Sequence, residues 1–148
     1  MITVVVQDLQ VALAIDESTI RDWSTRALEY LDIEDTELSI VLVDDAYIQK
    51  LNKTYLDRDR PTNVISFPQQ DGSDPLSNLL GDIAISVQRA IDEADQAEML
   101  PMERVKQLLV HGICHLCGYN HEGVTEDEAL RMENKEAQIV DLLRHNAE

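Results

Sequence analysis

Residues 111–121 have the sequence His111-Gly112-Ile113-Cys114-His115-Leu116-Cys117-Gly118-Tyr119-Asn120-His121 and contain three of the four histidines of the chain. In an α-helix, residues four apart lie ~40° apart around the axis and one turn along it, so His111 and His115 share one face. Gly118 can take a left-handed conformation that ends the helix and turns the chain back, which brings His121 to the same point. Three neutral imidazoles that leave a fourth coordination position open are typical of a catalytic zinc site. The spacing therefore predicts one Zn²⁺, or another divalent cation, on His111, His115 and His121.

The same histidine spacing occurs in the metzincin proteases, whose motif is HExxHxxGxxH. Those enzymes have a glutamate, their general base, directly after the first histidine, whereas this chain has Gly112 there. Glycine has no side chain that accepts a proton. The segment therefore contains the predicted metal ligands without the base of a protease, and the sequence leaves the general base unassigned.

A structural zinc site would need a fourth protein ligand, for which Cys114 and Cys117 are the candidates. With His111 placed at 0° on a helical wheel, Cys114 falls at ~300° and Cys117 at ~240°. The histidines point on average to ~20°, so Cys117 points well away from them and Cys114 roughly sideways. The pattern therefore predicts that the two cysteines are small core residues, and neither metal ligands nor a redox pair.

The chain has 148 residues, of which 44% are hydrophobic and 28% charged. These values predict one folded domain over residues 1–148. The N-terminal residues do not resemble a signal peptide and no apolar run approaches the ~20 residues of a membrane span, so we expect a cytoplasmic protein without a membrane anchor. The net charge of −17 predicts a surface that repels nucleic acid on average. RNA binding would require a local reversal of this charge.

Alternation predicts a strand at residues 37–44, and short apolar runs predict strands at residues 4–6, 64–67 and 83–85. The strand at 64–67 should lie at a sheet edge because Pro68 follows it. Apolar residues at helical spacing predict helices that begin at Ser18 or Thr19, at Asp44 or Asp45, at Ser86, at Pro101 and at Thr125. The helix from Pro101 should end near Gly118. Strands precede most of the helices in this order, which predicts an α+β fold with a small mixed sheet packed against helices.

Two charged segments have opposite signs. Lys50, Lys53, Arg58 and Arg60 fall within eleven positions, although two aspartates interrupt them. If this loop faces the histidines, Arg58 and Arg60 are candidate contacts for RNA or phosphate; otherwise it is a solvated turn. The acidic residues of the last helix predict a solvated face, namely Glu126, Asp127, Glu128, Glu133 and Glu136.

The segment from His111 to His121 resembles the HGxLHLxGYDH signature of the YbeY family of bacterial endoribonucleases and rRNA maturation factors. Two other stretches agree with the family pattern: Thr54-Tyr55 followed by Arg60-Pro61-Thr62-Asn63-Val64-Ile65-Ser66-Phe67-Pro68, and Leu79-Leu80-Gly81-Asp82-Ile83. The acidic stretch Glu126-Asp127-Glu128-Ala129 also fits. With the order of the elements included, the resemblance covers nearly the whole chain.

The resemblance implies a single α+β domain with a zincin (metzincin)-like core and one divalent metal, usually zinc, on His111, His115 and His121. It also implies cleavage of single-stranded RNA, with a role at rRNA ends and in ribosome quality control. The implied partners are rRNA and the ribosomal small subunit or its associated proteins.

Two positions depart from the family pattern. Leu56 stands where the family has an arginine implicated in catalysis, and a leucine side chain cannot bind a phosphate. Arg58 or Arg60 from the same loop is the candidate replacement. Asn120 stands where the family has an aspartate, so a hydrogen bond from a carboxylate there becomes one from an amide.

These observations leave three hypotheses. The leading one is a metal-dependent endoribonuclease that acts on single-stranded rRNA. The second is a ribosome assembly factor whose metal is mainly structural and whose nuclease activity is weak or absent, which the leucine at position 56 supports. The third is a metallohydrolase of peptides, which the histidine spacing supports and Gly112 opposes.

Overall fold

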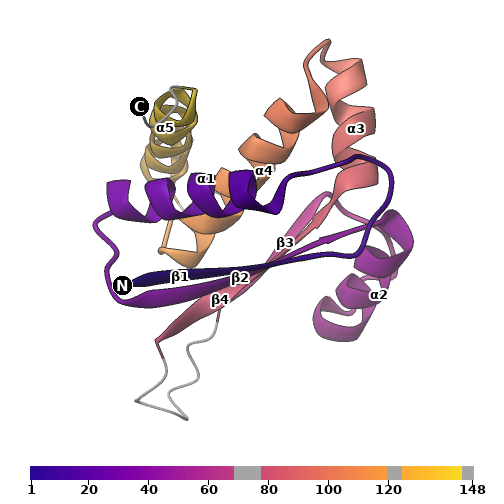
Figure 1. Ribbon diagram of the computed structural model, residues 1–148, viewed down its shortest axis with the longest axis horizontal. Coiled ribbons are helices and arrows are strands. Elements are labelled where there is room, and N and C mark those ends of the chain that lie inside the picture. The colour runs from indigo at the N-terminus through magenta and orange to yellow at the C-terminus, as the bar shows by residue number, and fades with distance from the viewer. Residues whose placement is uncertain (69–77, 120–124, 145–148) are drawn as a thin grey trace.

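The computed structural model describes residues 1–68, 78–119 and 125–144. These residues form one four-stranded sheet and five helices (Figure 1). In chain order the elements are β1 (Ile2–Asp8), α1 (Glu17–Tyr30), β2 (Thr36–Val43), α2 (Asp45–Leu56), β3 (Val64–Pro68), β4 (Leu79–Ser86), α3 (Val87–Gln96), α4 (Pro101–Leu116) and α5 (Glu126–Leu143). The predicted α+β fold is confirmed. None of the helices within these ranges is both long and apolar enough to cross a membrane.

The sheet is mixed, as predicted. Its strand order is β1-β2-β4-β3, in which β1, β2 and β4 are parallel and β3 is antiparallel to β4. β3 is confirmed as an edge strand, and Pro68, which has no backbone N–H, is its last residue. β4 is longer than the predicted residues 83–85, because its first residues also pair with β2, beginning with Leu79 opposite Glu37.

The helices cover the two faces of the sheet unequally. The larger core lies between one face and the layer that contains α1, α4 and α5 (Figure 1). α2 packs on the opposite face, over a smaller cluster of Val43, Ile48, Ile65 and Ala84. α4 lies in the middle of the larger layer and contacts α1, α3, α5, β3 and β4. This helix carries His111 and His115.

Side-chain caps begin most of the helices where the sequence predicts them. Three caps accept a hydrogen bond from the backbone N–H three residues further on, namely Asp44, Ser86 and Thr125. The prediction for α1 is wrong, because its cap is Asp16 and neither Ser18 nor Thr19. Asp16 Oδ1 accepts hydrogen bonds from the backbone N–H of Ser18 at 2.9 Å and from its Oγ at 2.7 Å. A carboxylate at this position also interacts favourably with the helix dipole.

α4 ends at the predicted glycine. Gly118 has a φ of +99°, and its N–H donates to the carbonyl of His115 at 3.1 Å. The N–H of Tyr119 donates to the carbonyl of Cys114 at 3.0 Å. These two bonds form a Schellman motif, which pairs the last carbonyls of the helix. The chain therefore leaves the helix axis within one turn of His115.

Two other glycines allow α4 to lie close against the sheet. A Cβ atom on Gly112 would come within 3.1 Å of Cδ1 of Ile83 in β4. A Cβ atom on Gly81 would come within 2.5 Å of the carbonyl oxygen of Phe67 and within 2.8 Å of Cδ2 of Leu116. The glycine in the stretch Leu79–Ile83 is therefore required by close packing, since β3, β4 and the end of α4 meet there.

We expect Gly81→Ala to lower the free energy of unfolding by about 3 kcal/mol, because the added methyl would overlap a backbone oxygen that moves only if the strand bends. Gly112→Ala should lower the free energy of unfolding by less than Gly81→Ala does. Alanine favours the helix by about 1 kcal/mol over glycine, and its methyl group meets a side chain that can shift. Urea denaturation of both variants measures the difference. A larger loss for Gly112→Ala would contradict this account of the packing.

Candidate active site

His111 and His115 lie one turn apart on α4 and line the same cleft. The side chain of His111 is 33% exposed, and His115 is exposed. His121 lies outside the described residues. The part of the chain that the structure describes contains no group of three His, Cys, Asp or Glu side chains that could hold a metal ion. The predicted site therefore depends on His121 as its third ligand, and this convergence stays a prediction.

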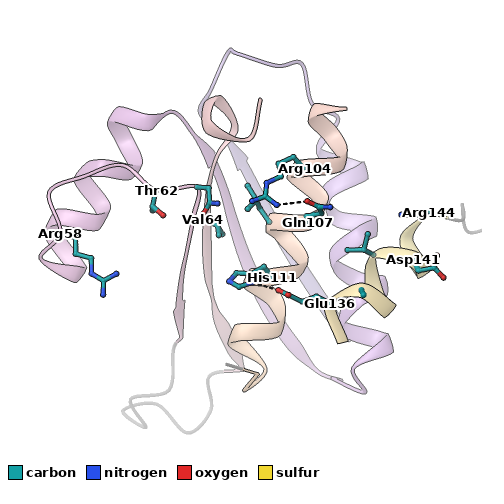
Figure 2. A pocket seen from close by; sticks show the side chains of 13 residues that line it. Arg58, Thr62, Val64, Arg104, Gln107, His111, Glu136, Asp141 and Arg144 are labelled. Carbon is teal, nitrogen blue, oxygen red and sulfur yellow. Dashed lines mark hydrogen bonds and ion pairs between the residues drawn. The ribbon is translucent and has the colours of Figure 1, made fainter. Parts of the chain in front are cut away.

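The cleft consists of two adjoining hollows of about 830 and 690 Å³, which share the wall residues Arg58, Thr62, Asn63, Val64 and His111. The first hollow extends towards α5 and is also lined by Arg104, Gln107, Leu108, Glu136, Ala137, Val140, Asp141 and Arg144. The second follows edge strand β3 and is also lined by Asn52, Leu56, Arg60, Pro61, Ile65, Ser66, Arg89, Glu93, Gly112 and His115. Figure 2 shows Arg58 and Thr62 on one wall, with His111 and Glu136 opposite. The cleft thus separates α4 and α5 from the segment that joins α2 to β3.

The loop that carries Arg58 and Arg60 is held in place by a buried amide. Asn52, which is only 3% exposed, donates from Nδ2 to the carbonyl of Arg60 at 2.9 Å. Its own carbonyl accepts a hydrogen bond from the N–H of Arg58 at 3.2 Å. Asp57, directly before Arg58, adopts the left-handed conformation with a φ of 56°. Aspartate tolerates this conformation better than most residues. The conformation of the loop is therefore set by α2 and does not require a ligand.

The predicted contacts Arg58 and Arg60 both lie on the wall of the cleft. The aspartate between them faces α2, where Asp59 accepts a hydrogen bond from Gln49 at 3.0 Å and pairs with Lys53 at 3.8 Å. Within the described ranges, the guanidinium groups of Arg58 and Arg60 make no hydrogen bond or ion pair. Both arginines are also exposed, so their contact with RNA or phosphate stays a prediction beside the alternative of a solvated turn.

Two other arginines of the cleft are already paired with carboxylates. Arg89 Nη2 lies 3.1 Å from Asp45 Oδ2, and Arg104 Nε lies 2.9 Å from Glu93 Oε1. These pairs join α3 to α2 and to α4, so they stabilise the walls. The charge that remains available for an anion comes from Arg58 and Arg60 in the loop after α2 and from Arg144 at the end of α5.

Glu136 is the functional candidate that sequence reasoning missed. The prediction that it belongs to a solvated acidic face is wrong, because its Oε1 lies 2.5 Å from Nδ1 of His111 and its side chain is only 23% exposed (Figure 2). Met132 and Ile139 are fully buried. Glu136 lies four residues after the first and three before the second, so it shares their face of α5. The spacing of Glu136 from the apolar residues Met132 and Ile139 is the sequence feature that could have predicted its position on the buried face.

The two cysteines are confirmed as core residues. Cys114 is fully buried and Cys117 packs partly against the same core. Burial raises the pKa of the Cys114 thiol to about 12 and that of Cys117 to about 11. At neutral pH both groups are therefore thiols rather than the thiolates that bind metals or react.

Gly112, which stands where the metzincin motif has its base, packs closely against β4. Its Cβ direction meets Ile83, so a glutamate side chain there would be forced against β4. A side chain at position 112 would therefore require Ile83 to shift, and glycine itself supplies no base.

The histidines also fit a divalent cation on chemical grounds. A carboxylate only accepts hydrogen bonds, so Nδ1 of His111 donates to Glu136, and Nε2 is the ring nitrogen left for a cation. This arrangement of a carboxylate behind an imidazole is common for metal-binding histidines. Imidazole nitrogens suit zinc, copper, iron and nickel.

The fold and the cleft define an α+β domain whose histidines and arginines face each other beside an edge strand. A model of the family described as Endoribonuclease YbeY matches residues 4–144. The chain belongs to the YbeY endoribonuclease family.

Two relatives show the extent of the similarity. The Endoribonuclease YbeY of Syntrophotalea carbinolica is 43% identical over 128 residues, which are 85% of each chain. That of Syntrophus aciditrophicus is 36% identical over 142 residues, which are 95% of this chain and 89% of the relative. The fold is also similar to the solution structure of TM1509 from Thermotoga maritima, with a TM-score of 0.65 at 22% identity over 97% of this chain and 89% of that one.

We expect Asn52→Ala to lower the free energy of unfolding by about 1–3 kcal/mol, because the substitution leaves the carbonyl of Arg60 without its buried donor. Chemical denaturation measures the loss. The adjacent variant Lys53→Ala is the control and should change stability by no more than about 0.5 kcal/mol, because Lys53 is exposed. Equal effects of the two variants would show that Asn52 does not hold the loop.

Proposed function

We propose that this chain is a metal-dependent endoribonuclease that cleaves single-stranded RNA during rRNA maturation and ribosome quality control. Its membership of the YbeY family supports cleavage of RNA. The observation that carries the proposal is the position of Arg58 and Arg60 on the cleft that His111 and His115 also line. These arginines supply the local reversal of charge that a protein with a net charge of −17 needs to bind RNA. Ribosomes, and hence this activity, belong to the cytoplasm, and the small subunit is the proposed partner.

The proposed cofactor is one Zn²⁺ held by His111, His115 and His121. Its support is the pair of imidazoles one turn apart and the carboxylate on Nδ1 of His111. The proposed core is zincin-like, since α4 carries both imidazoles across a mixed sheet next to its antiparallel edge strand. Residues 1–148 form the proposed nuclease domain.

The residues of the cleft have separate roles in this proposal. Arg58 and Arg60 bind phosphates of the strand and hold it against α4. When bound, the cation supplies Lewis acidity towards a phosphodiester oxygen. The bonds to Asn52 hold the backbone of this loop before RNA arrives, which lowers the cost of ordering the loop on binding.

A second candidate function is a ribosome assembly factor with a mainly structural metal. Leu56, which is 46% exposed, lines the cleft where the family pattern has an arginine. Nothing in a leucine side chain stabilises a phosphate, so the reaction would depend on the neighbouring arginines. A peptide hydrolase is disfavoured, because Gly112 stands where the metzincin motif has its glutamate base.

The double variant Arg58→Ala/Arg60→Ala is expected to bind single-stranded RNA about 10-fold more weakly at low salt. Its plot of log affinity against log salt concentration should be shallower by about 1.4, since each lost phosphate contact removes roughly 0.7 from the slope for a single strand. Fluorescence anisotropy at several salt concentrations measures both quantities. Arg21→Ala/Lys50→Ala is the control, because it removes the same charge from exposed positions elsewhere. If the two double variants behaved alike, the loop would have no specific role.

His115→Ala is expected to reduce cleavage of single-stranded RNA by roughly 100-fold or more in zinc-loaded protein, because it removes a proposed ligand of the group that stabilises charge in the transition state. Gel analysis of RNA incubated with each protein measures the loss, and casein serves as the peptide substrate. Equal RNA decay in both samples would indicate a contaminating nuclease and contradict the proposal. Association of the wild-type protein with ribosomes but no cleavage would favour the assembly factor, and digestion of casein would favour the peptide hydrolase.

A further inference from the structure

A carboxylate occupies the buried face of α5. Met132, Glu136, Ile139 and Leu143 follow one another at intervals of four, three and four residues, and the three apolar members are at most 3% exposed. Glu136 is thus directed at the neighbouring helices with its side chain only 23% exposed. An ionised group at such a position costs free energy unless a partner compensates it. The position therefore calls for a specific interaction.

The partner is the first predicted metal ligand. Oε1 of Glu136 lies 2.5 Å from Nδ1 of His111, within the range of a strong charge-assisted hydrogen bond. This contact joins α5 to α4 at the wall of the cleft (Figure 2). Because the carboxylate accepts, it selects the tautomer of His111 that has its lone pair on Nε2. It also limits rotation of the ring.

α5 is itself held in register by α1. Arg26 Nη2 donates to the carbonyl of Leu142 at 2.9 Å, and the hydroxyl of Tyr30 donates to Oε1 of Gln138 at 3.0 Å. The two α5 residues that accept these bonds, Gln138 and Leu142, lie on either side of the buried Ile139 in the sequence. Glu136 therefore lies on a helix that hydrogen bonds to α1 hold in place.

We propose that Glu136 is a positioning residue for the metal site: it fixes the tautomer and orientation of His111 so that Nε2 binds the divalent cation. This inference rests on the proposed function, in which His111, His115 and His121 hold the cation. Glu136 itself does not touch the cation in this proposal. It acts through the ring of His111, so its removal should weaken metal binding without removing a ligand.

The test compares Glu136→Gln and Glu136→Ala with the wild-type protein, and Glu133→Gln is the matched control. Glu133 lies one turn earlier on α5 and is exposed. Competition titration with a chromophoric chelator gives the zinc affinity, the absorption spectrum of the Co²⁺-substituted protein reports the geometry of the ligands, and thermal unfolding without metal reports stability. We expect Glu136→Ala to bind Zn²⁺ roughly 10–100-fold more weakly and to change the Co²⁺ spectrum. Glu136→Gln, which keeps a neutral acceptor, should lie between Glu136→Ala and the wild type, and Glu133→Gln should match the wild type.

The outcomes distinguish this inference from the proposed function. Wild-type affinity and spectrum in both Glu136 variants would overturn the positioning role and leave the metal site intact. A loss of thermal stability without a loss of zinc affinity would also overturn it, because the contact would then be only structural. A wild-type protein that binds no zinc at 1:1 stoichiometry would overturn both proposals. If Glu136→Ala does not fold, Glu136→Gln against Glu133→Gln decides the question.

Discussion

The close approach of α4 to the sheet is the constraint on which the rest of the structure depends. Because Gly112 and Gly81 have no Cβ, α4 lies directly over β4, with Gly112 against Ile83 and Leu116 of its last turn against Gly81. The rotation of α4 is thereby fixed, and the face that carries His111 and His115 lies beside β3. A Cβ atom on Gly81 would overlap the backbone oxygen of Phe67, whereas one on Gly112 would require only that Ile83 shift. The side of α4 that carries Gly112 packs tightly on β4, whereas the side that carries His111 and His115 lines the cleft.

Charge is distributed unevenly around the cleft of a strongly acidic protein. Most nearby carboxylates are engaged with partners inside the fold, as in the pairs that join Arg89 to Asp45 and Arg104 to Glu93. Arg58 and Arg60 face the cleft from a loop whose shape is set by Asn52. The overall charge therefore describes the average surface but not the cleft, since a potential at short range depends on the nearest groups and their pairing.

Most secondary structure could be predicted from the sequence, because it depends on neighbours along the chain. The helix caps at Asp44, Ser86 and Thr125 and the stop at Gly118 follow from local hydrogen-bond chemistry and backbone sterics. The start of α1 was missed, since several adjacent residues of this chain can cap a helix and only the backbone conformation selects among them. The length of β4 was underestimated because strand pairing with β2 extends it.

The sequence by itself determined the fold class, the histidine pair on one helix face and the glycine that ends that helix, since each follows from the 3.6-residue period or from the backbone freedom of one residue. Only the tertiary structure decided that the loop after α2 lies across a cleft from these histidines and that Glu136 lies behind His111. Both facts join elements far apart in the chain. Which segments meet depends on how the helices pack on the sheet, and no local pattern records that geometry.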